Sequence, residues 1–143
     1  MGMNKYIAVL VVLLLAGCAG NRVVQKDDFR QMFVQTLKEN KGALSNKFSD
    51  YYVAKCLPGK TEQAAEDFYS FTVDCIYDID DDMPDMLSKS DSVDYEKKVD
   101  QCARVKFVKK YKDDIDMQTI PRENRSRCLQ ILNGFEDVIA LTK

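Results

Sequence analysis

The sequence predicts an all-α fold, a compact bundle of about five helices stapled by two disulfides. After residue 26, apolar residues recur at steps of three and four, as on the buried face of a helix. The period-two alternation typical of strands is absent beyond a few residues. Four cysteines fall on or beside the apolar stripes: Cys56, Cys75, Cys102 and Cys128. Cysteines in these positions can join one helix to another.

Each helix is predicted from its own apolar stripe and its end signals. The first three predicted helices are Lys26 to Asn40, Leu44 to Lys55 and Thr61 to Ile79. The fourth is capped by Asp91 or Ser92 and ends near Tyr111, and the last runs from about Pro121 through Ile139. Gly42 and the pair Pro58-Gly59 punctuate the chain, because both residue types interrupt helices. An acidic loop, Asp80 to Ser90, and a polar loop, Lys112 to Thr119, separate the later helices.

The N-terminus has the organisation of an export signal. Lys5 provides a positive charge, and Ile7 to Ala16 is almost wholly aliphatic. This run is about half of the roughly 20 apolar residues that a membrane span requires. Ala16 and Gly17 are the small residues that a cleavage site needs.

The four residues Leu15-Ala16-Gly17-Cys18 resemble the lipobox of bacterial lipoproteins. The resemblance implies that the Cys18 thiol is diacylglyceryl-modified, that the chain is cut before it, and that the new amine is acylated. It also implies a lipid-anchored protein of the bacterial cell envelope. Ala19, which follows the cysteine, resembles the pattern for sorting to the outer membrane, facing the periplasm. The alternative is an ordinary signal peptide or membrane anchor in which Cys18 is incidental.

The predicted domain organisation follows from this signal. Residues 1–17 form the signal peptide, residues 18–26 a lipidated tether, and residues 27–143 a single helical domain. Removing residues 1–17 takes away one lysine and no acid, which leaves 20 basic and 23 acidic residues and a net charge of −3. This balance gives no electrostatic indication of nucleic-acid binding.

An even number of cysteines in an exported chain is typical of disulfides. A zinc site is disfavoured because the cysteines are 19, 27 and 26 residues apart and the chain contains no histidine. Helix register favours the nested pairing, Cys75–Cys102 with Cys56–Cys128. The sequential pairing, Cys56–Cys75 with Cys102–Cys128, stays open, although it needs Cys56 to reach about 21 Å along the next helix.

The acidic stretch from Asp74 to Asp85 is the sharpest polar feature of the sequence. Asp78, Asp80 and Asp82 match positions 1, 3 and 5 of an EF-hand loop, but Met83 and Lys89 occupy the positions that need Gly and Glu. We therefore predict a solvated loop, with a looser cation site as an alternative. A second interpretation makes it a contact surface for a basic partner, with five candidate residues: Asp78, Asp80, Asp81, Asp82 and Asp85.

A basic cluster at the end of the fourth helix, formed by Arg104, Lys106, Lys109 and Lys110, is interpreted as a solvated face that complements the helix dipole. The sequence predicts no catalytic, cofactor-binding or metal-ligating residues, since a chain without histidine cannot form a Ser-His or Cys-His pair. The predicted function is a non-enzymatic protein-binding module, similar in build to pilotin lipoproteins, with an envelope protein as its partner. A periplasmic immunity or inhibitor protein is the first alternative, and an envelope enzyme is the second.

Overall fold

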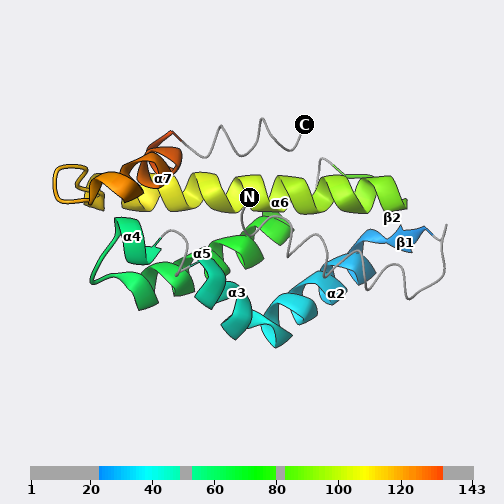
Figure 1. The fold of residues 1–143 in the computed structure, drawn as a ribbon. Coiled ribbons are helices and arrows are strands. Elements are labelled where there is room, and N and C mark those ends of the chain that lie inside the picture. The colour runs from blue at the N-terminus through cyan, green and yellow to red at the C-terminus, as the bar shows by residue number, and fades with distance from the viewer. Residues whose placement is uncertain (1–22, 49–52, 80–82, 134–143) are drawn as a thin grey trace.

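The longest element of the described residues is α6, Lys89–Tyr111, which runs along one side of the fold (Figure 1). The computed structural model describes residues 23–48, 53–79 and 83–133. At 1.5 Å per residue, the 23 residues of α6 extend about 34 Å. The buried side chains of α6 recur every three or four residues and include Tyr95, Val99, Ala103 and Phe107. The spacing of three and four residues that predicts this helix is therefore the spacing of the side chains on its packing face.

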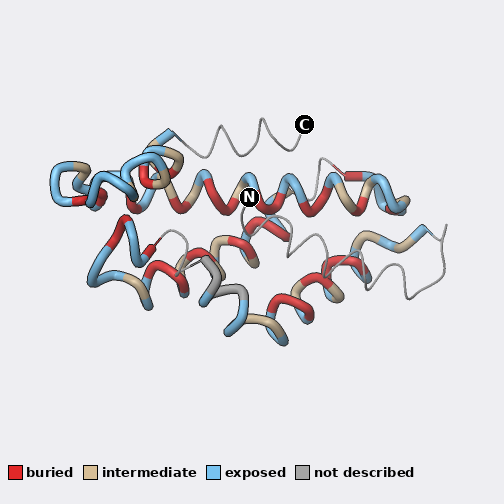
Figure 2. Tube along the Cα trace, viewed as in Figure 1, coloured by how far each residue is buried: buried red, intermediate tan, exposed pale blue. Residues whose placement is uncertain are grey.

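Two helices cover this face of α6. α5, Thr61–Asp78, packs antiparallel to it through buried Phe68, Cys75 and Ile76. α2, Lys26–Glu39, contributes Phe29 and Phe33, both fully buried. Edge-on aromatic contacts join the layers: the ring centroids are 5.4 Å apart for Phe29–Tyr95 and 5.9 Å apart for Phe68–Phe107. In Figure 2 the buried residues line the facing sides of these helices.

The predicted second helix, Leu44 to Lys55, can be compared with the structure only at its two ends, because residues 49–52 lie outside the described residues. α3, Lys41–Phe48, begins earlier than predicted and includes Gly42, and Cys56 is the last residue of α4, Ala54–Cys56. Gly42 is exposed in the first turn of α3, and a Cβ there would meet no heavy atom within 4 Å, so no close contact requires glycine at this position. The Pro58-Gly59 turn that follows α4 is confirmed, and Gly59 adopts a φ of 89°, a conformation that favours glycine.

α7, Arg122–Leu132, closes the end of the bundle near α4. Pro121 is its N-cap, and a 3-10 turn, Lys112–Asp114, precedes the loop that leads to it. The rest of the predicted last helix, beyond residue 133, lies outside the described residues. Cys56 is bonded to Cys128, and Cys75 to Cys102, with Cα–Cα distances of 5.5 and 5.9 Å. The nested pairing is the one that forms.

A two-stranded antiparallel ribbon lies at the opposite end of α6, and the sequence pattern did not predict it. β1, Val24–Gln25, pairs with β2, Met86–Leu87, with Val24 opposite Leu87. Two residues per strand are too few to show an alternating pattern. Residues 24–26 of the predicted tether thus form β1 and the start of α2, and two residues of the predicted acidic loop form β2.

The start of α6 is earlier than predicted. Ser88 is the N-cap, and its Oγ accepts a hydrogen bond from the Asp91 backbone N–H at 3.1 Å. Asp91 in turn accepts one from the Ser88 N–H at 2.9 Å, which completes a capping box. Ser92, predicted as an alternative cap, is buried inside the helix and donates to the Ser88 carbonyl at 3.0 Å.

Candidate functional site

Two of the five predicted partner-contact aspartates can be placed. Asp78 ends α5, and Asp85 immediately precedes β2. Both are exposed, and each forms an ion pair: Asp78 with Lys106 at 2.6 Å, and Asp85 with Lys26 at 3.6 Å. Asp80, Asp81 and Asp82 lie outside the described residues. Met83, at the position where an EF-hand needs glycine, is a buried core residue.

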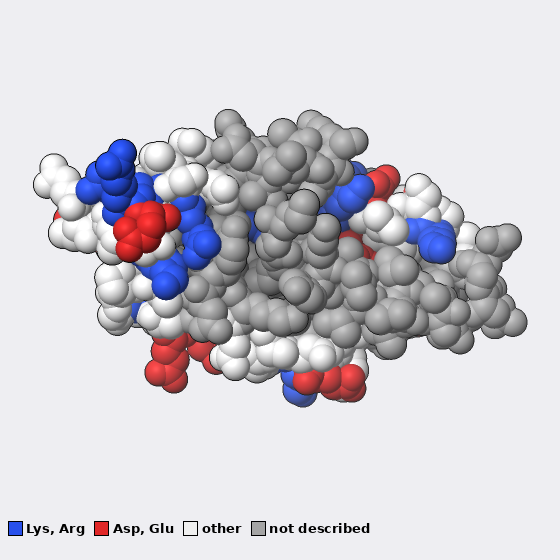
Figure 3. Space-filling model, in the orientation of Figure 1, with Lys and Arg blue, Asp and Glu red and all other residues white. Residues whose placement is uncertain are grey.

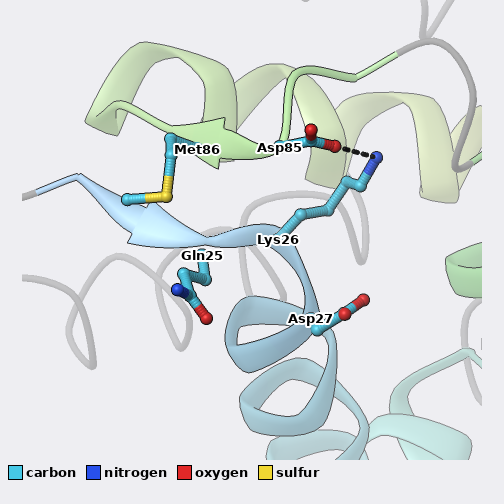
Figure 4. Close-up of a pocket in the computed structure, with 5 residues that line it drawn as sticks. All are labelled: Gln25, Lys26, Asp27, Asp85 and Met86. Atoms are coloured by element: carbon cyan, nitrogen blue, oxygen red, sulfur yellow. Dashed lines mark ion pairs between the residues drawn. The ribbon is translucent and has the colours of Figure 1, made fainter.

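A shallow hollow of about 200 Å³ lies beside the β ribbon (Figure 4). Its lining consists of Gln25, Lys26, Asp27, Asp85 and Met86. The Lys26 ammonium also donates to the Met83 carbonyl at 3.2 Å, which fixes the lysine at the wall of the hollow. Because ligand pockets usually measure about 300–1,000 Å³ and are largely apolar, this small polar hollow does not resemble a substrate pocket.

The most closely grouped metal-ligand atoms of the described residues surround the Cys75–Cys102 disulfide. A carboxylate oxygen of Asp78 and the two sulfur atoms all lie within 4.8 Å of one another. The sulfurs are bonded to each other, whereas a metal requires free thiolates, and the Asp78 carboxylate is paired with Lys106. In the disulfide form the cluster is therefore an ion pair beside a disulfide.

A buried charged stripe on α6 was not predicted. Glu96, Asp100 and Arg104 are spaced four residues apart and are 3%, 5% and 1% exposed. Arg104 Nε donates to Asp100 Oδ2 at 2.8 Å, so this arginine belongs to the interior and not to the solvated basic face expected for it. Burial raises the pKa of Asp100 in spite of Arg104, and it raises the pKa of Glu96 to about 8. Charges spaced four residues apart are also found on exposed helix faces, so the pattern alone cannot reveal this stripe.

Tyr95 is the hub of a buried polar network that joins three helices. Its hydroxyl donates to the Ile76 carbonyl in the last turn of α5 and accepts from Arg30 Nε of α2 at 3.0 Å. Arg30 also pairs with Asp27 at 2.8 Å. The Ile76 carbonyl is one of the four that the end of α5 leaves without a partner inside the helix. The tyrosine therefore satisfies it from the neighbouring helix.

A second network lies near the other end of the pair α5 and α6. Asp67 accepts hydrogen bonds from Lys110 Nζ at 2.6 Å and from the Tyr111 hydroxyl. Burial alone would raise the pKa of Asp67, but these two donors outweigh it and lower the pKa. Burial and the Asp67 carboxylate raise the pKa of Tyr111, which stays a neutral donor. Both networks join neighbouring helices through side-chain hydrogen bonds.

The outward face of α7 carries both arginine and apolar side chains. Arg122, Arg125 and Leu129, spaced at i, i+3 and i+7, share one side of the helix and are all exposed. Cys128 and Ile131 are buried on the opposite side. Figure 3 shows lysine and arginine side chains gathered at this end of the molecule, with acidic groups among them. We name the three outward residues the α7 face.

Cys18, the predicted lipidation site, lies outside the described residues. None of the helices in the described part of the chain combines the length and apolar character needed to cross a bilayer. Comparisons with protein families, curated proteins and solved structures find no match.

Proposed function

We propose that the chain is a lipoprotein of the bacterial cell envelope, anchored through Cys18, that acts as a non-enzymatic protein-binding module. The outer membrane, on its periplasmic side, is the proposed location. An envelope protein is the proposed partner. The proposal combines the lipobox resemblance with the geometry of the folded domain.

The two disulfides are the observation that supports it most strongly. Disulfides persist in oxidising compartments such as the periplasm and are rare in the cytosol. All four cysteines of the helical domain are paired, and each pair joins two helices of the core. A domain stapled in this way suits a chain that carries an export signal.

The short connection to Cys18 also supports an anchored domain. Only six Cα–Cα steps join Cys18 to Val24, the first residue of β1. An extended chain spans at most about 3.5 Å per residue, so an acylated Cys18 would hold the β ribbon within about 21 Å of the bilayer. The α7 end, separated from the ribbon by the length of α6, would be the end free to project toward a partner.

The α7 face supports a protein partner with an acidic surface. Arginine is enriched in protein interfaces and in their energetic hot spots, and Leu129 supplies apolar area beside the two arginines. Arg122 forms no ion pair with any described residue, so its charge is available to an incoming carboxylate.

Site-specific photo-crosslinking in the native bacterium tests this proposal. A photoreactive residue at Arg125 should form an adduct with an envelope protein, whereas the same residue at exposed Asn46 on α3 is the matched control. The substitution Arg122→Glu should weaken the adduct formed through position 125. Labelling at position 125 no stronger than at position 46 would contradict the assignment of the α7 face.

The inhibitor alternative places the contact at the acidic segment. Asp85 favours it, since its side chain is fully exposed and lies beside half-exposed Met86. A photoreactive residue at position 85 would then capture a toxin or hydrolase while position 125 stays silent. The same experiment therefore separates the two functions.

A further inference from the structure

The two disulfides differ in how well solvent reaches them. Cys56, Cys128 and Cys75 are at most 1% exposed, whereas Cys102 is only partly buried. Thiol–disulfide exchange requires a thiolate to reach one of the two sulfurs, so access selects the bond that reacts. By this criterion Cys75–Cys102 is the reactive disulfide, and Cys102 carries the sulfur that is attacked.

An ion pair lies across this bond. Asp78 lies about one turn after Cys75 on α5, and Lys106 lies about one turn after Cys102 on α6. Because the two helices are antiparallel, these two residues lie on opposite sides of the disulfide along the bundle. The side chains nevertheless meet at 2.6 Å, with an Asp78 carboxylate oxygen within 4.8 Å of both sulfurs. The pair is part-exposed, so a thiol can approach beside it.

We propose that Cys75–Cys102 is an exchange site for an attacking dithiol, whereas Cys56–Cys128 is a purely structural bond. One thiolate of the dithiol bonds to Cys102 Sγ, and the electron pair of the S–S bond leaves on Cys75 Sγ, which takes a proton from water. The second thiolate of the reagent then displaces Cys102 as a thiol and closes the reagent into a disulfide. Two electrons pass from the dithiol to the protein.

The ion pair sets the rate of the first step. Negative charge develops on Cys75 Sγ, and the nearby Asp78 carboxylate repels this charge. The Lys106 ammonium offsets the repulsion. Removing the ammonium therefore slows the exchange, and removing the carboxylate accelerates it. A pair that acted only as a steric cover would behave differently, because either substitution would open the cover and speed the reaction.

Timed reduction with dithiothreitol, followed by alkylation and peptide mass spectrometry, tests the order of opening. Free thiols, including any at Cys18, are blocked beforehand. We expect Cys75 and Cys102 to be alkylated at least about tenfold faster than Cys56 and Cys128 in the native protein, and at similar rates in denaturant. Simultaneous opening of the native bonds, or earlier opening of Cys56–Cys128, would overturn the proposal.

Three variants test the role of the ion pair. Lys106→Met should slow the opening of Cys75–Cys102 about threefold and Asp78→Asn should speed it by a similar factor, as expected for exposed charges near the reacting sulfur. Lys109→Met, which removes an exposed lysine on the same helix, is the matched control. Changes of the same sign in the two ion-pair variants would refute the electrostatic part of the account.

Discussion

Glu96 lies in an environment far from the one in which a carboxylate ordinarily ionises. Its side chain is buried, and neither carboxylate oxygen has a hydrogen-bond partner among the residues that the structure describes. Burial without a partner penalises the charged form, which is why its pKa rises from 4.5 to about 8. The folded protein therefore holds this proton at neutral pH, whereas the unfolded chain releases it.

This difference predicts the sign of the pH dependence of stability. Because the pKa of Glu96 is raised in the folded state, its contribution to the free energy of unfolding is most favourable below about pH 4.5. This contribution falls as the pH rises toward 8. The loss amounts to at most about 1.4 kcal/mol per pH unit. Asp100, whose pKa burial also raises, contributes with the same sign.

The variant Glu96→Gln should flatten this dependence, since an amide does not titrate. Denaturant unfolding followed by circular dichroism between pH 5 and about pH 8.5 measures it. Asp94→Asn, an exposed carboxylate on the same helix, is the control and should keep the wild-type slope. A wild-type protein that gains stability across this range would contradict the assignment.

Among the helices, α6 has the best-defined start. The reciprocal hydrogen bonds between Ser88 and Asp91 satisfy donors that the first turn would otherwise leave open. The Ser88 backbone and side-chain donors lower the pKa of Asp91, so the cap carries a negative charge at the positive end of the helix dipole.

Replacing Ser88 with Ala should therefore lower the free energy of unfolding by about 1 kcal/mol. The loss should appear in equilibrium unfolding at neutral pH. Ser90→Ala, an exposed change in the same first turn that touches no cap contact, should leave stability within about 0.5 kcal/mol of wild type. Equal effects of the two substitutions would show that the capping box does not stabilise α6.

The helices that the sequence predicted best are those with a long apolar stripe. α2, α5 and most of α6 follow the predicted bounds within a few residues. The start of the predicted helix from Leu44 to Lys55 was wrong, because α3 begins at Lys41 and continues through Gly42, where the sequence predicted an interruption. α4 is only three residues long, and its position depends on Cys56, which is bonded to Cys128 far along the chain. Contacts of this kind leave no local pattern.

For the molecule as a whole, register along the helices favoured the correct disulfide pairing, whereas the buried charges of α6 were not predicted. Positions along antiparallel helices favoured the nested disulfides, and these form. The Cys56–Cys128 bond, which spans 72 residues, contributes about 4 kcal/mol in the chain-entropy picture. The stripe from Glu96 to Arg104 and the Tyr95 network were missed because hydropathy assigns charged residues and tyrosine hydroxyls to the surface.

The mass of the N-terminal peptide tests the central claim, that Cys18 fixes the domain to a membrane. Protein extracted from envelopes of the native bacterium should yield a peptide that begins at Cys18 and carries fatty acyl chains, and Cys18→Ala should leave the membrane fraction. A first peptide that retains residues 1–17, or an unmodified Cys18 in soluble protein, would contradict the account.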